Sequence, residues 1–177
     1  MNNTALPTTA LGRTGMEVTR LGYGTSMRRP VSKEYAGELL TMCLNSGMNF
    51  LDSARDYTRY VISESMIGHH LSGRASDFFV ATKCGCTDNR PDQNYSDHIW
   101  SRQNLLEGLD ISLERLRTDS IDVMQLHNPT VEDCERGRLI ETLEDMRRMG
   151  KVKWIGVSTT LPHLPTFLDW GTFDTFQ

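Results

Sequence analysis

Short runs rich in β-branched or aromatic residues, typical of buried strands, recur along the chain, and each is followed by apolar residues at helical spacing. Five such strand–helix units follow one another. The predicted strands are Leu21–Thr25, Asn49–Ala54, Phe78–Lys83, Ile121–His127 and Lys153–Ser158.

The helices that follow these strands carry apolar stripes and recognisable ends. Ser32 is the expected N-cap of the first helix, and Gly47 its terminator. The second helix is expected over Ser63–Leu71 and stops before Gly73. A weaker, proline-interrupted helix is expected over Leu161–Trp170. The stripes of the third and fourth helices are Leu105, Leu109, Leu113 and Leu116, then Leu139, Ile140, Leu143 and Met146.

Regular alternation with nearly continuous apolar strands predicts parallel strands covered by helices, either closed into a barrel or open. No G-x-G-x-x-G motif follows the first strand, so the fingerprint of the open dinucleotide-binding sheet is absent. Asp52, Lys83, His127 and Ser158 all stand near the carboxyl ends of predicted strands. Because these ends converge at one mouth of a barrel, the pattern favours a TIM-type (β/α)8 fold.

The chain is short for such a barrel, which usually needs about 250 residues, whereas it has 177. Residues 1–177 are therefore expected to form a single partial barrel domain, truncated to the first five βα units. Phe173–Gln177 would begin a sixth strand. Ala10–Val18, with Gly12 and Gly15, predicts an N-terminal β-hairpin that closes the bottom of the barrel.

Composition is that of an ordinary globular protein, with 38% hydrophobic and 24% charged residues. A formal net charge of -4 and the lack of a basic block argue against nucleic acid and anionic membranes as partners. No apolar run approaches the roughly 20 residues that span a bilayer, and the N-terminus does not resemble a signal peptide. A cytoplasmic protein is expected.

The four cysteines are expected to be reduced thiols, because they are few and fall within regular elements. Cys84 and Cys86 form a C-x-C pair that could suggest a metal. No metal site is expected, since two close thiols without nearby ligands rarely bind one.

Four residues resemble the pattern of the aldo-keto reductase family. Asp52 and Tyr57 stand in the sequence FLDSARDY, Lys83 ends the strand VATK, and His127 stands in QLHNP. Their order and placement on successive strands match the family. The opening LGRTG through LGYGT also looks like the family's start, so the resemblance covers essentially the whole chain.

Chemistry gives these four residues complementary roles. Hydride addition to a carbonyl leaves negative charge on its oxygen, which a proton donor and hydrogen-bonding groups must meet. Tyr57 would donate the proton, and Lys83 would favour the phenolate and bring the pKa of Tyr57 towards neutral pH. Asp52 would keep Lys83 charged and oriented, and His127 would bind the substrate oxygen.

Each of these residues alone has an ordinary structural explanation, as a cap, a turn or a solvated side chain; the combination on successive strands favours function. Tyr60 is a second candidate for the donor. The family usually has glycine after the tyrosine, where this chain has Thr58, so the loop departs from the family pattern.

The resemblance implies a nicotinamide cofactor, and it favours NADP(H) over NAD(H). It places Thr25 near the nicotinamide ribose, and Ser158 and Gln177 at the carboxamide. Asp52 and Thr159 are also expected to bind the cofactor. Thr159 stands where asparagine is common, so one hydroxyl replaces an amide. Ser158 and Thr159 could instead cap the helix that follows them.

The sequence therefore predicts an NAD(P)H-dependent oxidoreductase that reduces aldehydes or ketones, or oxidises the corresponding alcohols and sugars. Two alternatives stay open: a non-catalytic nicotinamide-binding or regulatory subunit of the same fold, similar to channel-associated subunits, and an inactive fragment. A partial barrel would expose strand edges, through which copies of the chain could associate.

Overall fold

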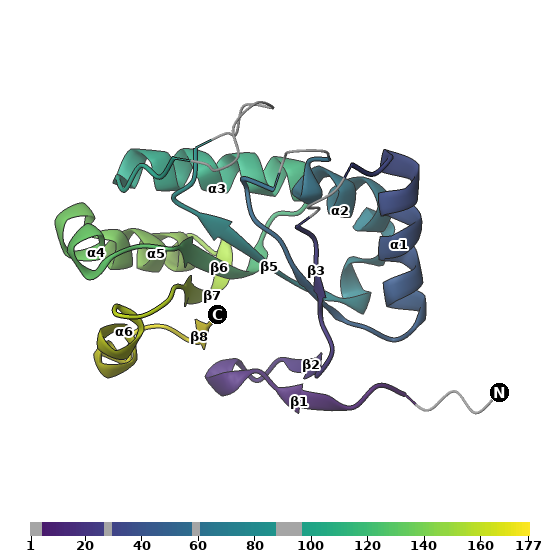
Figure 1. Cartoon of the computed structure of the whole chain (residues 1–177), viewed down its shortest axis with the longest axis horizontal. Coiled ribbons are helices and arrows are strands. Elements are labelled where there is room, and N and C mark those ends of the chain that lie inside the picture. The colour runs from purple at the N-terminus through teal and green to yellow at the C-terminus, as the bar shows by residue number, and fades with distance from the viewer. Residues whose placement is uncertain (1–4, 27–29, 58–60, 88–96) are drawn as a thin grey trace.

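The computed structural model describes residues 5–26, 30–57, 61–87 and 97–177. A six-stranded parallel sheet lies at its centre, and its strands follow one another in space in the same order as in the chain. The sheet curls into an open trough (Figure 1). Its strands are β3 (Tyr23–Gly24), β4 (Phe50–Asp52), β5 (Phe79–Cys84), β6 (Ile121–His127), β7 (Val152–Ser158) and β8 (Thr175–Phe176).

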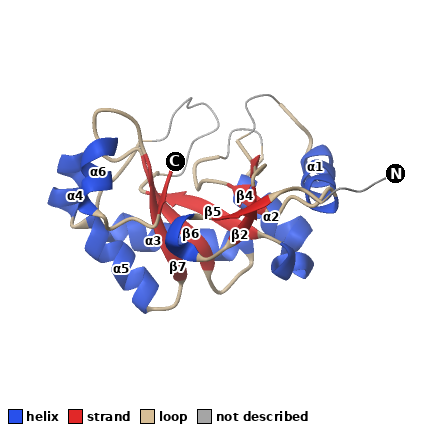
Figure 2. Cartoon of the chain, turned by 90° about the horizontal axis from the view of Figure 1, so that it is seen from below, coloured by secondary structure: helices blue, strands red, loops and turns tan. Residues whose placement is uncertain are grey.

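All five predicted strands and the start of the sixth are present, although β3 and β4 are shorter than expected. The helices lie mainly outside the curled sheet (Figure 2). They are α1 (Lys33–Asn45), α2 (Ser63–Leu71), α3 (Arg102–Leu116), α4 (Val131–Gly137), α5 (Leu139–Arg148) and α6 (Leu164–Trp170), with a 3-10 segment, η2 (Ser72–Asp77), after α2.

Local capping explains two of the helix starts. The Ser32 hydroxyl accepts a hydrogen bond from the backbone N–H of Tyr35, which confirms it as the N-cap of α1. α4 was not expected as a separate helix. Thr130 and Asp133 form a reciprocal capping box at its start, and Arg138, in a left-handed conformation, separates α4 from α5.

Two apolar clusters lie on the two sides of the sheet. The large outer cluster joins the sheet to the helices, and Leu109, Leu126, Leu143 and Ile155 are among its buried members. The smaller inner cluster comprises Met16, Val18, Ala81 and Val123. The trough is therefore packed at its amino end by apolar side chains.

Alternation along the strands places polar residues on the inner side beyond this cluster. Successive side chains point to opposite faces of a sheet, and the inner-cluster residues of β5 and β6 stand two positions before Lys83 and Gln125. Lys83 is paired with Gln125, and His127 with Ser158. Polar side chains of three neighbouring strands thus share the inner face at their carboxyl ends.

The predicted N-terminal hairpin is confirmed. β1 (Thr8–Ala10) pairs with β2 (Glu17–Thr19) in antiparallel register, with a 3-10 turn, η1 (Gly12–Thr14), between them. Val18 and Met16 pack in the inner cluster, so the hairpin closes the bottom of the trough. Arg13 donates to the Asp174 carboxylate at 2.7 Å and to the carbonyl of Gly171, which ties the hairpin to the segment before β8.

This arrangement of parallel strands inside and helices outside is that of a TIM-type barrel, here as a curled partial sheet. β3 and β8 are its two edges. Within the described residues, no helix is both long and apolar enough to span a bilayer.

Candidate active site

The Lys83 ammonium lies at the centre of a buried polar cluster. Its Nζ atom lies 2.9 and 2.8 Å from the two carboxylate oxygens of Asp52 and 2.9 Å from the carbonyl oxygen of Ser53. It also donates to the Tyr57 hydroxyl at 3.3 Å. The side chain of Lys83 is only 1% exposed and that of Asp52 17%, so the ion pair is largely removed from water.

Burial controls the acidity of Tyr57 more strongly than Lys83 does. Loss of hydration raises the pKa of Tyr57 above its ordinary value of 10.0, and the carboxylates of Asp52 and Asp56 act in the same direction. Lys83 lowers the pKa but does not offset burial. The expected fall towards neutral pH is therefore not found, and the phenol is held in its protonated, proton-donating form.

His127, the last residue of β6, lies opposite Tyr57 with their rings edge to face at a centroid distance of 6.1 Å. Its Nδ1 atom lies 3.4 Å from an Asp56 carboxylate oxygen and 3.0 Å from the sulfur of Cys86. One side of the imidazole thus faces a carboxylate and a thiol. The four predicted residues Asp52, Tyr57, Lys83 and His127 lie around one site.

Gln125 is a member of this site that was not expected from the sequence. It is 3% exposed, and its side-chain N–H group lies 3.4 Å from Asp52 Oδ1 and 3.5 Å from the Gln177 side-chain oxygen. The signal was available, because Gln125 stands two positions before His127 on an apolar strand and so shares its face. It links the lysine cluster to the end of β8.

Of the predicted cofactor residues, Ser158 and Gln177 lie at the carboxyl ends of adjacent strands, next to the polar cluster. Thr25 and Thr159 are buried. Thr25 donates its hydroxyl and its backbone N–H to the Asp52 carbonyl, at 3.0 and 2.8 Å. Thr159 donates its N–H to the Gln177 carbonyl at 2.9 Å. Both threonines therefore hold neighbouring site residues in place.

The second donor candidate, Tyr60, lies outside the described residues, as does most of the loop after Cys86. All four cysteines are buried, and none of them forms a disulfide bond in the part of the chain that the structure describes. Burial raises the pKa of the Cys84 and Cys134 thiols to about 12. Cys86 is different, because the structure brings the imidazoles of His98 and His127 to its sulfur, although we expected no ligands near it.

Comparison with known proteins identifies relatives of this chain. Residues 20–163 match the model of the Aldo/keto reductase family. The L-galactose dehydrogenase of Arabidopsis thaliana is 32% identical over 168 residues, which cover 86% of this chain and 48% of that protein. A probable voltage-gated potassium channel subunit beta from Oryza sativa subsp. japonica is 35% identical over 123 residues, covering 67% of this chain and 36% of that protein.

Among solved structures, the holo form of the aldo-keto reductase AKR11C1 from Bacillus halodurans superposes with a TM-score of 0.84 at 27% identity, covering 97% of this chain and 57% of that one. The chain belongs to the aldo/keto reductase family. The matches to these curated relatives cover most of this chain but only about half of the relatives' length.

Proposed function

We propose that this chain carries the proton-transfer part of an NAD(P)H-dependent oxidoreductase, which reduces aldehyde or ketone carbonyls or oxidises the corresponding alcohols and sugars. The observation that carries the proposal is the Lys83 ammonium, buried and shared between the Asp52 carboxylate and the Tyr57 hydroxyl. A lysine in this position stabilises developing negative charge on the phenol oxygen after proton loss.

Tyr57 is the proposed proton donor. Because Lys83 donates to its oxygen, the phenol's own hydrogen is available to a substrate oxygen. Its raised pKa keeps that hydrogen in place at neutral pH. In reduction, the carbonyl carbon gains a hydride, the carbonyl oxygen takes the Tyr57 proton, and the double bond becomes a single bond. His127 positions the same oxygen, and Asp52 holds the Lys83 ammonium in place through both of its carboxylate oxygens.

The nicotinamide cofactor supplies the hydride when it is bound, and the residues at the carboxyl ends of β7 and β8 suit its carboxamide. Gln177 offers an amide beside Gln125, and Ser158 offers a hydroxyl on the adjacent strand. A carboxamide needs both donors and acceptors, which an amide and a hydroxyl provide. Thr25 and Thr159 complete the proposed cofactor set, with NADP(H) favoured over NAD(H).

The first test is fluorescence titration of the chain with NADPH and NADH, with light scattering recorded alongside. Saturable binding would support a cofactor site within this chain. The absence of binding by folded, monodisperse chain would contradict the proposed set at Ser158 and Gln177. A panel of aldehydes, ketones and aldoses then tests turnover, together with NADP+-linked oxidation of sugars.

The second test is Tyr57→Phe, which removes one oxygen atom. We expect turnover to fall at least about 100-fold, because general acid catalysis contributes about that much, while cofactor affinity is unchanged. Tyr35→Phe is the matched control, since Tyr35 is exposed on α1. Nearly normal turnover by Tyr57→Phe would transfer the donor role to another group, such as Tyr60.

A second candidate function is a non-catalytic nicotinamide-binding subunit, which the similarity to a potassium channel beta subunit favours. The two candidates differ in one result. A non-catalytic subunit would bind the cofactor without oxidising it in the presence of any carbonyl compound, and Tyr57→Phe would then change nothing. A chain that neither binds cofactor nor stays monodisperse would be an inactive fragment.

A further inference from the structure

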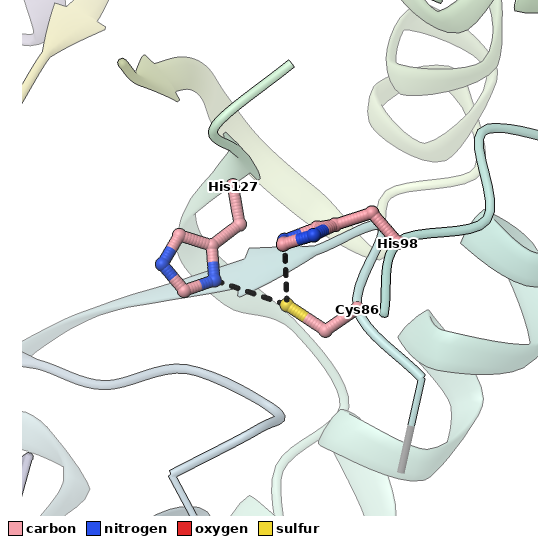
Figure 3. Close-up of side chains that lie close together, drawn as sticks. All are labelled: Cys86, His98 and His127. Carbon is pink, nitrogen blue, oxygen red and sulfur yellow. Dashed lines mark hydrogen bonds between the residues drawn. The ribbon is translucent and has the colours of Figure 1, made fainter. Parts of the chain in front are cut away.

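The inner mouth of the sheet contains a second group of chemically active side chains, beside the lysine cluster. Figure 3 shows the sulfur of Cys86 facing the rings of both His98 and His127. Cys86 Sγ lies 3.0 Å from His127 Nδ1 and 3.8 Å from His98 Nε2, and the three atoms all lie within 4.8 Å of one another. Three metal-binding atoms from separate segments thus converge on one point.

We propose that Cys86, His98 and His127 form a zinc site. A tetrahedral zinc ion with bonds of about 2.3 Å to sulfur and 2.0–2.1 Å to nitrogen holds its sulfur and nitrogen ligands about 3.6 Å apart. The two sulfur-to-nitrogen distances, 3.0 and 3.8 Å, lie on either side of that value. One thiolate and two imidazoles are also the ligand types that zinc prefers, whereas Mg²⁺ and Ca²⁺ favour oxygen.

The backbone fixes these ligands before any metal arrives. Cys86 and His98 face each other across an antiparallel bridge. Hydrogen bonds flank it, from Thr87 N–H to the Asp97 carbonyl at 2.8 Å and from Ile99 N–H to the Gly85 carbonyl at 2.9 Å. Metal binding therefore needs little further ordering of the chain.

Neighbouring side chains fix the orientation of the proposed ligands and partly balance the charge of a bound zinc ion. The His98 ring stacks on Trp100 at a centroid distance of 5.2 Å. Gly85 has a positive φ of 97°, and a Cβ atom there would lie 2.0 Å from the Trp100 ring, so the turn that presents Cys86 requires glycine. The Asp56 carboxylate beside His127 offsets the charge that zinc retains after binding one thiolate.

Three protein ligands leave the fourth position of a tetrahedral ion open to water or to another oxygen. Because His127 is shared, occupied zinc would change its availability to a carbonyl substrate. This consequence rests on the proposed function, but the metal site itself does not. Its test accordingly needs no cofactor and no turnover.

The experiment is titration of the reduced full chain with Co²⁺, a spectroscopic substitute for zinc, followed by displacement with Zn²⁺. We expect one equivalent to give intense visible bands of tetrahedral cobalt and a near-ultraviolet sulfur-to-cobalt charge-transfer band, both abolished by Zn²⁺. The charge-transfer band should disappear in Cys86→Ser. His98→Gln should weaken binding at least about tenfold and leave the thiolate band at saturation.

Cys134→Ser is the matched control, because Cys134 is equally buried but lies on α4 outside the cluster. It should bind cobalt like the original chain. Absence of cobalt bands in the original chain, or a charge-transfer band that survives in Cys86→Ser, would overturn the proposal. If Cys86→Ser failed to fold, unchanged affinity in His98→Gln would overturn it equally. Cobalt binding by a chain without oxidoreductase activity would leave the zinc site standing while the proposed function failed.

Discussion

Replacing Lys83 by methionine measures how much the buried ion pair between Lys83 and Asp52 contributes to the stability of the fold. Methionine has nearly the same length and volume, so packing within the sheet is largely kept. The Lys83→Met variant removes an ammonium that makes hydrogen bonds to both Asp52 oxygens, to the Ser53 carbonyl and to the Tyr57 hydroxyl. It leaves the Asp52 carboxylate with a distant donor, Gln125 at 3.4 Å.

Breaking one partner of a buried ion pair costs about 3–5 kcal/mol, because the other charge stays desolvated. The Asp52 side chain is 17% exposed, so water reaches it in part and the lower end of that range applies. We expect the free energy of unfolding to fall by about 3 kcal/mol, roughly a hundredfold in the folded-to-unfolded ratio. In the double variant Asp52→Asn/Lys83→Met, no buried charge is left without a partner, and the loss in the free energy of unfolding should be only about 1 kcal/mol.

The assay is urea denaturation followed by tryptophan fluorescence, with and without 1 M salt as a screening condition. Lys153→Met is the matched control, since Lys153 makes a similar 2.8 Å contact with Asp122 but its side chain is 56% exposed. That variant should lose less than about 1 kcal/mol, and salt should reduce the difference. Equal losses for the two lysine variants, or a double variant that loses the sum of its parts, would refute this reasoning.

Three further predictions concern stability and one concerns assembly. Asp174→Ala should lower the free energy of unfolding, measured by urea denaturation, by about 2–4 kcal/mol, because it leaves the Ile155 N–H and the arginine partners without their acceptor. Arg13→Ala should lower it by only about 1 kcal/mol, since Arg13 is exposed. Equal losses for the two variants would contradict this expectation. Burial raises the pKa of Glu64, so the folded chain takes up a proton at this carboxylate more readily than the unfolded chain does. The original chain should therefore become more stable relative to Glu64→Gln as the pH falls from neutral towards 4.5. A stability difference that does not change with pH would contradict this expectation. Gly156→Ala should lower stability by about 1–3 kcal/mol, since its Cβ would lie 2.2 Å from the Thr175 hydroxyl oxygen, and an unchanged denaturation midpoint would show that β8 yields easily. Light scattering should reveal concentration-dependent association through the edges β3 and β8; a monomer at every concentration would exclude it.

Much of the site followed from the sequence because it lies on regular strands. Asp52 and His127 end their strands and Lys83 stands one residue before the end of the strand between them. Parallel strands bring their carboxyl ends together whatever the loops do. Gln125 could have been found by the same reasoning, through its period-two relation to His127. Family resemblance supplied the roles, and those roles stay predictions.

The acidity of Tyr57 and the surroundings of Cys86 did not follow from the sequence. The sign of a pKa shift depends on how much water reaches the phenol and on every nearby charge, and burial outweighs Lys83 here. The partners of Cys86 depend on His98 facing it across an antiparallel bridge and on His127 from a separate strand. Neither the pKa of Tyr57 nor the partners of Cys86 can be predicted from the spacing of residues along the sequence.

Except for the separate helix α4, the sequence by itself determined the order and type of the main strands and helices, because hydrophobic periodicity and capping residues act within a few positions of the chain. Ser32, Ser63–Leu71 and Ile121–His127 are examples in which those local signals coincide with the structure. Only the tertiary structure decided the distances among side chains from different strands and loops. Hydrogen bonding, desolvation and metal coordination change over an ångström or less, and that precision arises only when distant segments pack together.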